Sequence, residues 1–373
     1  MKVKLSDAFD LQMGKTPPRN DRECWGDGHK WISISDIGNA GKYIDTTKEE
    51  ITDIGVSKSG IKVVPKGTVI MSFKLSIGKT AITAEDMYTN EAIMAFINKE
   101  KYEIDTDYLY HMCKGIDWFE GTNKAVLGLT LNKATMSEKE IEIPSMEVQS
   151  HVVLVLDKMD ELISLRKEQL AKLDQLVKSR FIELFGDRYT NDKKWDNKPL
   201  YECADFYNGK AHEQVVDENG EYILVTSRCI ASDISDYRRT NALLFPLQVN
   251  DIAMVMSDVP NGRALAKCIL IDEDGKYTLN QRICCLRNYL FNPIFFYHLL
   301  NRHEYFLSFN DGNAQTNLRK DDLLACNIII PPLELQEQFA AFVEQTDKSK
   351  LAIQQSLEKL ETLKKSLMQE YFG

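Results

Sequence analysis

Two short strings are the first candidates for chemistry, because glycine, lysine and threonine in this order close many phosphate-binding loops. They are Gly14-Lys15-Thr16 and Gly78-Lys79-Thr80. Such a loop also needs a glycine five residues earlier, so that its backbone N–H groups can surround the phosphates. Phe9 and Phe73 stand at those positions. Neither string is therefore predicted to bind a nucleotide.

Signatures of other reactions are also missing from the sequence. It contains no N-P-P-[YF] or D-P-P-Y string to hold a flipped adenine, and no G-x-G-x-x-G for a nucleotide cofactor. A Pro-Asp dipeptide, H-E-x-x-H and G-x-S-x-G are absent as well. We predict a chain that recognises a partner and is not an enzyme, with no cofactor or metal of its own.

The elements that could position recognition residues occur twice. Shifting the sequence by 187 positions aligns residues 105–186 with 292–373 without a gap, and 21 of these 82 positions are identical. A period this long exceeds that of a solenoid repeat. It predicts a duplicated domain plus helix, related by a pseudo-two-fold axis.

The bulk composition allows two globular units of ordinary size. The 373 residues are 43% hydrophobic and 27% charged, and no membrane span or signal peptide is expected. The chain is predicted to be cytoplasmic. Its net charge of −10 argues against a simple basic nucleic-acid binder, so any DNA affinity would come from local arrangement or from a more basic partner.

The eight cysteines include no C-x-x-C pair, and only two of them, Cys24 and Cys113, lie in the first half. A disulfide framework or zinc site of the ancestral unit would occur in both halves. We interpret all eight as free thiols in the core.

Each half follows the same order of elements. Strand-like runs come first, such as 31–35 and 252–256, then a helix from about Tyr108 or Ile294, and then a short strand ending at Pro144 or Pro331. A long helix closes each half. This order predicts a mixed α+β fold with globular heads at 1–145 and 187–332, and helical spacers at 146–186 and 333–373.

The two closing helices carry apolar residues at the seven-residue spacing of a coiled-coil seam. We predict that they pack antiparallel and that the seam is formed by Leu156, Ile163, Leu170, Leu173, Val177, Leu184, Ile353, Leu357, Leu360 and Leu367. A surface amphipathic helix on each domain is the alternative.

Several segments resemble the specificity subunit of type I restriction-modification systems, and the resemblance covers the whole chain. The opening Leu11–Pro17 is one of them, although its second-half counterpart Phe206–His212 lacks the Thr-Pro. The others are the paired helical repeats, Leu131–Lys133 with Ile141–Gln149, Gly312–Leu318 with Ile330–Gln336, Leu184–Gly186, and Tyr371–Gly373.

The resemblance implies that each of two heads reads one half of a bipartite double-stranded DNA site, while the helices set the gap. The subunit itself is then non-catalytic. It would recruit two methyltransferase subunits, which carry S-adenosylmethionine, and motor-nuclease restriction subunits. A non-catalytic coiled-coil scaffold that binds proteins alone remains the alternative, and the acidic charge favours it.

Base reading needs side chains with hydrogen-bond forks, and phosphate contacts need cations. In the first head we expect DNA contacts from Lys15, Thr16, Arg19, Ser33, Ser35, Ser72, Lys74, Lys79, Asn90 and Asn132. In the second head we expect them from Lys210, His212, Ser227, Arg228, Ser257, Asn261, Arg263, Asn280, Gln281, Arg282, Gln315 and Asn317.

Overall fold

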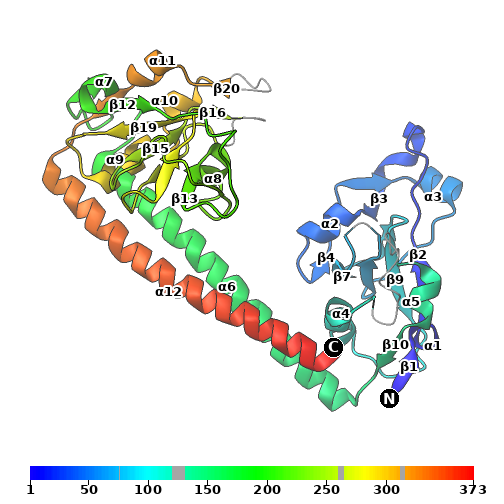
Figure 1. Ribbon diagram of the computed structural model, residues 1–373. Helices are drawn as coiled ribbons and strands as arrows, with labels where there is room; N and C mark the ends of the chain where they lie inside the picture. The colour runs from blue at the N-terminus through cyan, green and yellow to red at the C-terminus, as the bar shows by residue number, and fades with distance from the viewer. Residues whose placement is uncertain (75, 120–130, 259–263, 311–315) are drawn as a thin grey trace. The chain divides into compact units, whose positions relative to one another are not determined.

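The computed structural model describes residues 1–74, 76–119, 131–258, 264–310 and 316–373. These residues form two compact units. Unit 1 comprises Met1–Lys167 and Gln355–Gly373, and unit 2 comprises Glu168–Gln354. Each unit therefore combines one head with part of both long helices (Figure 1). The four-segment division made from the sequence stays a prediction.

The head of unit 1 is built on a five-stranded sheet. Its strand order is β2 (Phe9–Met13), β9 (Ile93–Asn98), β6 (Val69–Ser72), β7 (Thr80–Thr83) and β4 (Tyr43–Ile44). A second sheet has the order β5 (Glu49–Ile51), β3 (Trp25–Ile32) and β8 (Tyr88–Thr89). The strands β1 (Lys2–Lys4) and β10 (Glu140–Glu142) pair separately. All of β6 and β7 is buried, and β6 is apolar except for Ser72 at its end.

The helices of this head are short. They are α1 (Leu5–Ala8), η1 (Arg22–Cys24), α2 (Ile34–Asn39), α3 (Asp53–Ser59), α4 (Thr106–Gly115) and α5 (Lys133–Glu138). The predicted helix near Tyr108 is α4. Its buried face contributes to one core with β2, β6 and β9.

The head of unit 2 repeats this plan. One sheet has the order β12 (Asp205–Asn208), β19 (Ile283–Arg287), β15 (Ile252–Val255) and β17 (Cys268–Leu270). Another has the order β14 (Arg238–Thr240), β13 (Tyr222–Val225) and β18 (Tyr277–Leu279). Two further pairs are β11 (Asn197–Pro199) with β21 (Asn327–Ile329), and β16 (Ser257–Asp258) with β20 (Thr316–Asn317).

The short helices of unit 2 are α7 (Leu200–Cys203), α8 (Ser227–Ala231), α9 (Pro293–Leu300), α10 (Glu304–Leu307) and α11 (Lys320–Leu324). The predicted helix near Ile294 is α9, which begins with Asn292 as its N-cap and Pro293 in its first turn. The parallel pair β3–β8 of unit 1 recurs as β13–β18 in unit 2. The mixed α+β class and the duplicated head are thus confirmed.

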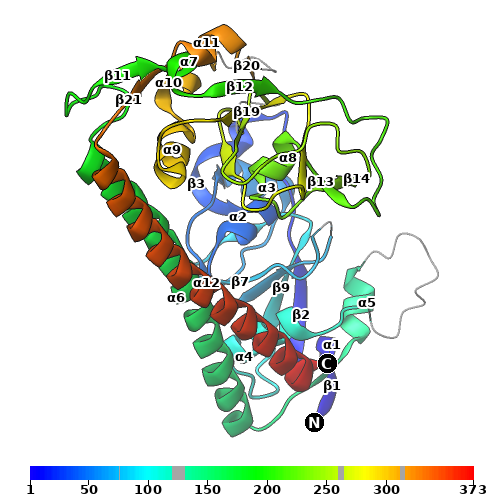
Figure 2. The ribbon, with the colours of Figure 1, turned by 60° about the vertical axis from the view of Figure 1, so that its left-hand side comes forward.

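Two uninterrupted helices of 40 residues, α6 (Met146–Phe185) and α12 (Leu333–Phe372), complete the chain. Within unit 1, Asp160 pairs with Lys364 and Glu361 pairs with Lys167, so numbers rise along α6 as they fall along α12. Within unit 2, Asp174 pairs with Lys350 in the same sense. The two helices are antiparallel in both units, as predicted (Figure 2).

The seam between the helices stays a prediction, which the burial of its residues supports. All ten seam residues are buried or half-buried, and Leu156 and Val177 are the most enclosed. Leucines off the seam, such as Leu154 and Leu165, are exposed instead. A two-helix seam covers only one side of each leucine, which explains why most of these residues are half-buried.

A glutamine fixes each long helix to the head that precedes it in sequence. The Gln149 side chain accepts a hydrogen bond from Asp105 N, the N-cap of α4, and donates to Pro144 O. Gln336 accepts from Asn292 N and donates to Pro331 O. Both side chains are buried, so the repeated Ile-Pro and Gln positions join the strand, the head helix and the long helix in one network.

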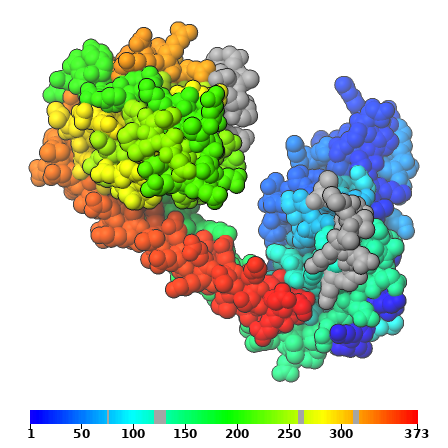
Figure 3. Space-filling model, in the orientation of Figure 1, coloured from blue at the N-terminus to red at the C-terminus, as the bar shows by residue number. Residues whose placement is uncertain are grey.

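The aromatic end of each long helix packs against the head helix of the unit in which that end lies. In unit 2, the Phe185 ring lies 4.6 Å from that of Phe295 on α9. In unit 1, the Phe372 ring at the end of α12 lies 5.5 Å from that of Tyr108 on α4. The space-filling view shows the end of α12 at the surface of unit 1 (Figure 3).

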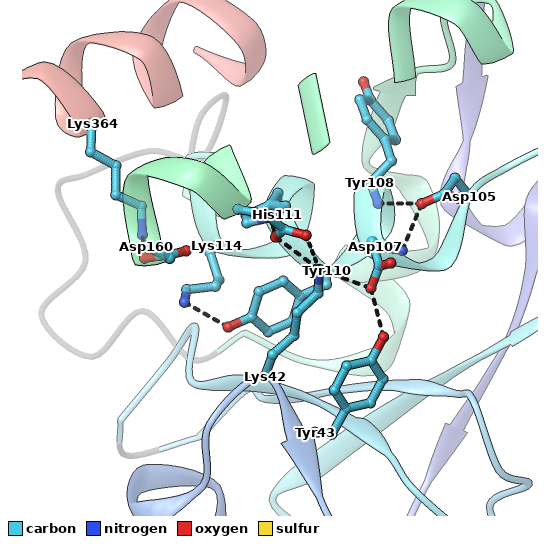
Figure 4. Close-up of polar contacts among 11 residues, drawn as sticks. Lys42, Tyr43, Asp105, Asp107, Tyr108, Tyr110, His111, Lys114, Asp160 and Lys364 are labelled. Carbon is cyan, nitrogen blue, oxygen red and sulfur yellow. Dashed lines mark hydrogen bonds and ion pairs between the residues drawn. The ribbon is translucent and has the colours of Figure 1, made fainter. Parts of the chain in front are cut away.

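A charged cluster also holds the head of unit 1 against α6 (Figure 4). The Lys42 ammonium lies 3.0 Å from Asp107 and 2.7 Å from Asp157, and His111 Nε2 lies 2.7 Å from Asp157. Burial alone would lower the pKa of Lys42, but the two carboxylates raise it. Burial lowers the pKa of His111, against the effect of Asp157. His111 is therefore a core histidine that also bonds Asp157.

All eight cysteines are free and buried, which confirms their interpretation as core thiols. Among the described residues, none of the helices combines the length and the apolar composition that a bilayer crossing demands.

Arg188 in unit 2 caps the end of α9. Its guanidinium donates to the carbonyl oxygens of His298 (2.7 Å), Leu299 (2.9 Å), Asn301 (3.1 Å) and Arg302 (2.9 Å). Helix C-termini leave such carbonyls without partners, and a buried orphan acceptor is costly.

The substitution Arg188→Ala is expected to lower the stability of unit 2 by about 2–4 kcal/mol, because several part-buried acceptors lose a charged donor. Hydrogen exchange of the α9 amides measures this local stability. The control is Arg228→Ala, which removes an exposed pair with Asp236 and should cost less than about 1 kcal/mol. Equal effects of the two variants would contradict the capping role.

His303 makes the stability of unit 2 sensitive to pH. Its side chain is buried, and burial together with Arg188 lowers its pKa to about 4. The unfolded chain binds a proton near pH 6.5, so stability falls as the pH drops from about 6.5 toward 4. At pH 5 the loss expected from His303 alone is about 2 kcal/mol relative to pH 7. Burial also lowers the pKa of His298 to about 4, so this residue should add a similar loss.

The variant His303→Asn tests this expectation. Tyr305 N donates to His303 Nδ1, and an asparagine oxygen can replace this acceptor without titrating. Urea denaturation at pH 7 and pH 5 should show a smaller loss for the variant than for the parent chain. An unchanged difference between the two pH values would place the titration elsewhere.

Candidate functional site

The loops at one end of the unit 1 sheets form a connected corner. It comprises Gly14–Thr16, Ser33–Ser35, Ser72–Lys79 without residue 75, and Asn90–Ala92, and we call it loop corner 1. Lys15 N donates to Thr89 O (2.9 Å), Asn90 N to Ile32 O (3.0 Å) and Phe73 N to Ala92 O (3.0 Å). Backbone bonds between segments far apart in sequence therefore fix their relative positions.

Unit 2 builds the same corner from different residues. Loop corner 2 comprises Gly209–His212, Thr226–Arg228, Met256–Asp258 and Asn280–Arg282. Lys210 N donates to Leu279 O (3.0 Å), Asn280 N to Val225 O (3.1 Å) and Met256 N to Arg282 O (3.2 Å). These are the counterparts of the three bonds in loop corner 1.

A glycine is required at the crossing in both corners. A Cβ atom on Gly14 would lie 2.0 Å from Thr89 O, and one on Gly209 would lie 2.0 Å from Asn280 O. No side chain fits at that distance from a backbone oxygen. The second-half opening, which lacks Thr-Pro, thus keeps the same backbone crossing as the first.

Loop corner 1 carries a mixed charge cluster. The Thr16 hydroxyl donates to the Glu91 carboxylate. Burial would raise the pKa of Glu91, but this bond and the nearby cations Lys74 and Arg19 lower it overall. Lys74 and Lys79 are exposed and are the cations best placed to reach a ligand at this corner.

Two other predicted cations of unit 1 hold the head together. The Lys15 ammonium donates to the carbonyl oxygens of Ser59 and Gly60 (both 3.1 Å), at the end of α3. The Arg19 guanidinium lies 3.9 Å from the ring of Trp25 and pairs with Glu49. Both side chains remain near the corner, but a ligand would have to compete with these contacts.

The remaining predicted residues of unit 1 serve local turns. Ser33 forms a capping box with Asp36 on α2 and bonds Ser35, and Asn132 caps α5. Ser72 Oγ accepts from Lys79 N (3.1 Å), which closes the β6–β7 loop. Asn90 Oδ1 accepts from Ala92 N (3.0 Å), which leaves its amide nitrogen to donate. Asn132 lies on α5, outside the segments that define loop corner 1.

Loop corner 2 differs in its side chains. Lys210 and Arg282 are exposed, and their side chains form no hydrogen bond or ion pair within the described residues. Gln281 donates to Glu213 (2.6 Å), Arg228 pairs with Asp236, and Ser227 donates to Ser257 O (3.3 Å). Asn280 Oδ1 accepts from Gln281 N (2.8 Å).

The structure removes one predicted residue from this surface. The His212 ring is fully buried, and its nitrogens lie 2.7 Å from Lys210 O and 3.0 Å from Thr278 Oγ1. The expectation that it contacts a ligand is therefore corrected: His212 supports the corner from inside. Asn317 on β20 pairs with Ser257 on β16. Asn261, Arg263 and Gln315 lie outside the described residues.

Glu91 and Glu213 were not predicted as site residues. Each carboxylate accepts a hydrogen bond from a predicted residue, Thr16 and Gln281 respectively. The chain has 56 Asp and Glu residues, so the residue type alone does not distinguish these two glutamates from the others. Glu91 follows Asn90 as Gln281 follows Asn280. Since Gln281 was predicted as a site residue, this alignment could have identified Glu91.

The two corners share three backbone hydrogen bonds and differ in the side chains that they present. Three or more His, Cys, Asp or Glu side chains do not gather as metal ligands anywhere in the described ranges.

The chain belongs to the family described as the type I restriction modification DNA specificity domain, which matches residues 1–175 and again residues 190–364. It is 29% identical over 199 residues to the type I restriction enzyme MjaIX specificity subunit of Methanocaldococcus jannaschii, covering 52% of this chain and 45% of that one. The HindI specificity subunit of Haemophilus influenzae is 26% identical over 186 residues, covering 48% and 40%. The chain thus spans about half the length of the curated relatives it matches.

Solved structures show the same fold. A chain from a study of complex assembly and conformational transition of the type I R-M system has a TM-score of 0.67 at 15% identity, covering 100% of this chain and 97% of that one. The type I restriction-modification S subunit from M. genitalium has a TM-score of 0.52 at 14% identity, covering 100% and 96%.

Proposed function

We propose that this chain is the DNA sequence-specificity subunit of a type I restriction-modification complex. Each loop corner reads one half of a bipartite site in double-stranded DNA, and α6 and α12 set the gap between the halves. The observation that carries this proposal is the duplicated corner, in which three backbone bonds recur while the side chains change. Two corners with the same backbone and different side chains suit a DNA site whose two halves differ in sequence.

The readers proposed for the first half-site surround Glu91. A carboxylate accepts from the amino group of cytosine, and an amide forms paired bonds with adenine. Glu91 and Asn90 supply these groups, while Lys74 and Lys79 supply the phosphate contacts. In loop corner 2, Arg282 matches guanine, Gln281 matches adenine, and Lys210 reaches phosphate.

The subunit is proposed to act without catalysis of its own. Two methyltransferase subunits carrying S-adenosylmethionine, and restriction subunits, would supply the chemistry. Leu176 on α6 and its counterpart Leu363 on α12 are both exposed, at 48% and 50%. An exposed leucine at the same place in each repeat suits two copies of one partner. A basic partner would also offset the net charge of −10.

The test is adenine methylation of a host genome that expresses this chain with a methyltransferase subunit. Mapping the modified adenines should reveal one motif with two short halves and a fixed gap. Omission of this chain should abolish the methylation. A methylated motif that does not change when this chain is replaced by a relative would contradict the proposal and favour a protein-binding scaffold.

A further inference from the structure

The strand β14 ends the three-stranded sheet of unit 2 and carries two adjacent arginines, Arg238 and Arg239. In its pairing with β13, Arg238 lies opposite Leu224 and Arg239 lies opposite Ile223 (Figure 2). The residue that follows β13 is Thr226, where a segment of loop corner 2 begins. Two residues of a strand span about 7 Å, so Arg238 lies close to this corner.

An ion pair also joins the start of β14 to loop corner 2. Arg228, the last residue of the corner segment that follows β13, pairs with Asp236. Asp236 lies two residues before Arg238 in the sequence. The strand pairing and this ion pair therefore both hold Arg238 beside the corner.

The backbone register identifies the counterpart of Arg238 in unit 1. Ile32 O and Val225 O accept equivalent hydrogen bonds in the two loop corners, as described above. The residues that precede them, Trp31 and Leu224, therefore correspond to each other. The residue opposite Trp31 in unit 1 is thus the counterpart of Arg238.

This counterpart carries the opposite charge. Trp31 lies opposite Glu49 on β5, and the next residue along β5 is Glu50. Two carboxylates therefore stand where β14 has its two arginines. Glu49 pairs with Arg19, and Glu50 accepts from Gly28 N (2.9 Å). Both carboxylates of unit 1 are thus bound within their own head.

The two arginines of unit 2 differ in their contacts. The Arg239 guanidinium donates to Gly220 O (3.3 Å) and Glu221 O (3.2 Å), and it lies 5.3 Å from the ring of Tyr237. It therefore stabilises the turn before β13. The Arg238 side chain is exposed and forms no hydrogen bond or ion pair within the described residues. Arg238 is the arginine that is free to bind a ligand.

A phosphate of the DNA backbone is the ligand that matches this place. Side chains that read bases enter the major groove, which is about 12 Å wide, and cations at its margins meet the phosphates. A cation about 7 Å from the readers of loop corner 2 falls at such a margin. The arginine fork suits a phosphate, because it can form two parallel charged hydrogen bonds.

We propose that Arg238 binds a backbone phosphate beside the second half-site. This inference rests on the proposed function of loop corner 2. The contact strengthens binding to any sequence and fixes the position of the head on the duplex, but it selects no base. Glu49, at the equivalent place in unit 1, would repel a phosphate, so the two heads hold the backbone differently.

The test measures binding of the selected bipartite duplex by this chain in complex with the proposed methyltransferase subunit. Arg238→Ala should weaken binding about 5-fold or more and reduce the slope of log affinity against log salt by about 1. Arg238→Lys should retain the slope, because it retains the charge. The base preferences of both variants should be those of the parent chain.

The matched control is Lys276→Ala, which removes the same charge from the same sheet. Lys276 directly precedes β18, at the end of the sheet away from loop corner 2, and pairs with Glu273. This variant should leave the affinity and the salt slope nearly unchanged. Equal effects of Arg238→Ala and Lys276→Ala would show a general effect of charge and would overturn the proposal.

Neutral methylphosphonate linkages, placed one at a time along the duplex, locate the contact. The parent complex should lose affinity at a linkage beside the second half-site, and the Arg238→Ala complex should be insensitive to that linkage. A variant that responds to every linkage as the parent does, or that changes its base preferences, would refute the phosphate contact alone. A parent complex that selects no sequence would refute the proposed function, and this inference with it.

Discussion

Inserting four residues into each long helix, after Lys167 of α6 and after Gln354 of α12, is expected to lengthen the preferred gap by one or two base pairs. Four helical residues add about 6 Å along the axis, and base pairs are stacked about 3.4 Å apart. The insertions lie where Arg166 Nε donates to Ser356 Oγ (3.2 Å) within unit 1, so both helices gain the same length at one level.

The effect on the original site should be large. A head moved by about 6 Å no longer aligns with its bases, and each lost base contact costs about 1–3 kcal/mol. Affinity for the original gap should therefore fall about 100-fold or more. The same four residues inserted in the exposed turn at Asp274–Gly275 should leave the gap unchanged. An unchanged gap preference in the helix variant would contradict the spacing role of the helices.

Substituting Arg282 with alanine is expected to relax the second half-site and leave the first intact. Its side chain is exposed at loop corner 2 and has no partner within the described residues, so its loss does not disturb the fold. A paired contact to guanine discriminates by about 1–3 kcal/mol, or roughly 5- to 150-fold.

The measurement for Arg282 compares binding to duplexes that vary one base pair at a time. Arg282→Lys retains the charge but loses the fork, so it should keep most affinity while losing discrimination. Lys79→Ala at loop corner 1 is the contrasting variant: it should weaken all sequences alike and reduce the salt dependence. Loss of discrimination in the first half-site by Arg282→Ala would refute its assignment to the second.

The main features of the fold could be predicted because the sequence patterns that indicate them occur in both halves of the chain. The seven-residue spacing of Leu156, Ile163 and Leu170 requires a long helix with one apolar side, and the second copy supplies the partner helix. Asn292 and Pro293 marked the start of α9. The antiparallel pairing, the buried seam and the free cysteines followed from such local patterns.

Other contacts could not be predicted from local sequence patterns, because they join residues that lie far apart in the sequence. From the sequence alone, Arg188 would be predicted to be a surface arginine in a polar segment. In the structure, its guanidinium donates to four carbonyl oxygens of residues about 110 positions away. No sequence pattern indicates that each head forms one compact unit with parts of both long helices.

The candidate site was predicted in outline but not side chain by side chain. The segments around Lys15, Ser33, Lys79 and Asn90 do meet at one corner. Polar type alone could not show that the Lys15 ammonium is bound to carbonyls, or that His212 is enclosed. Those facts depend on how α3 and β18 pack behind the loops, which only the assembled fold determines.

The central claim is that one chain reads two half-sites at a fixed gap. The most direct measurement is selection from a randomised duplex library by this chain co-expressed with the proposed methyltransferase subunit. Recovery of two short motifs at one constant gap is the predicted result. A complex that remains intact and yet enriches no sequence, or enriches a single motif without a second half, would contradict the account.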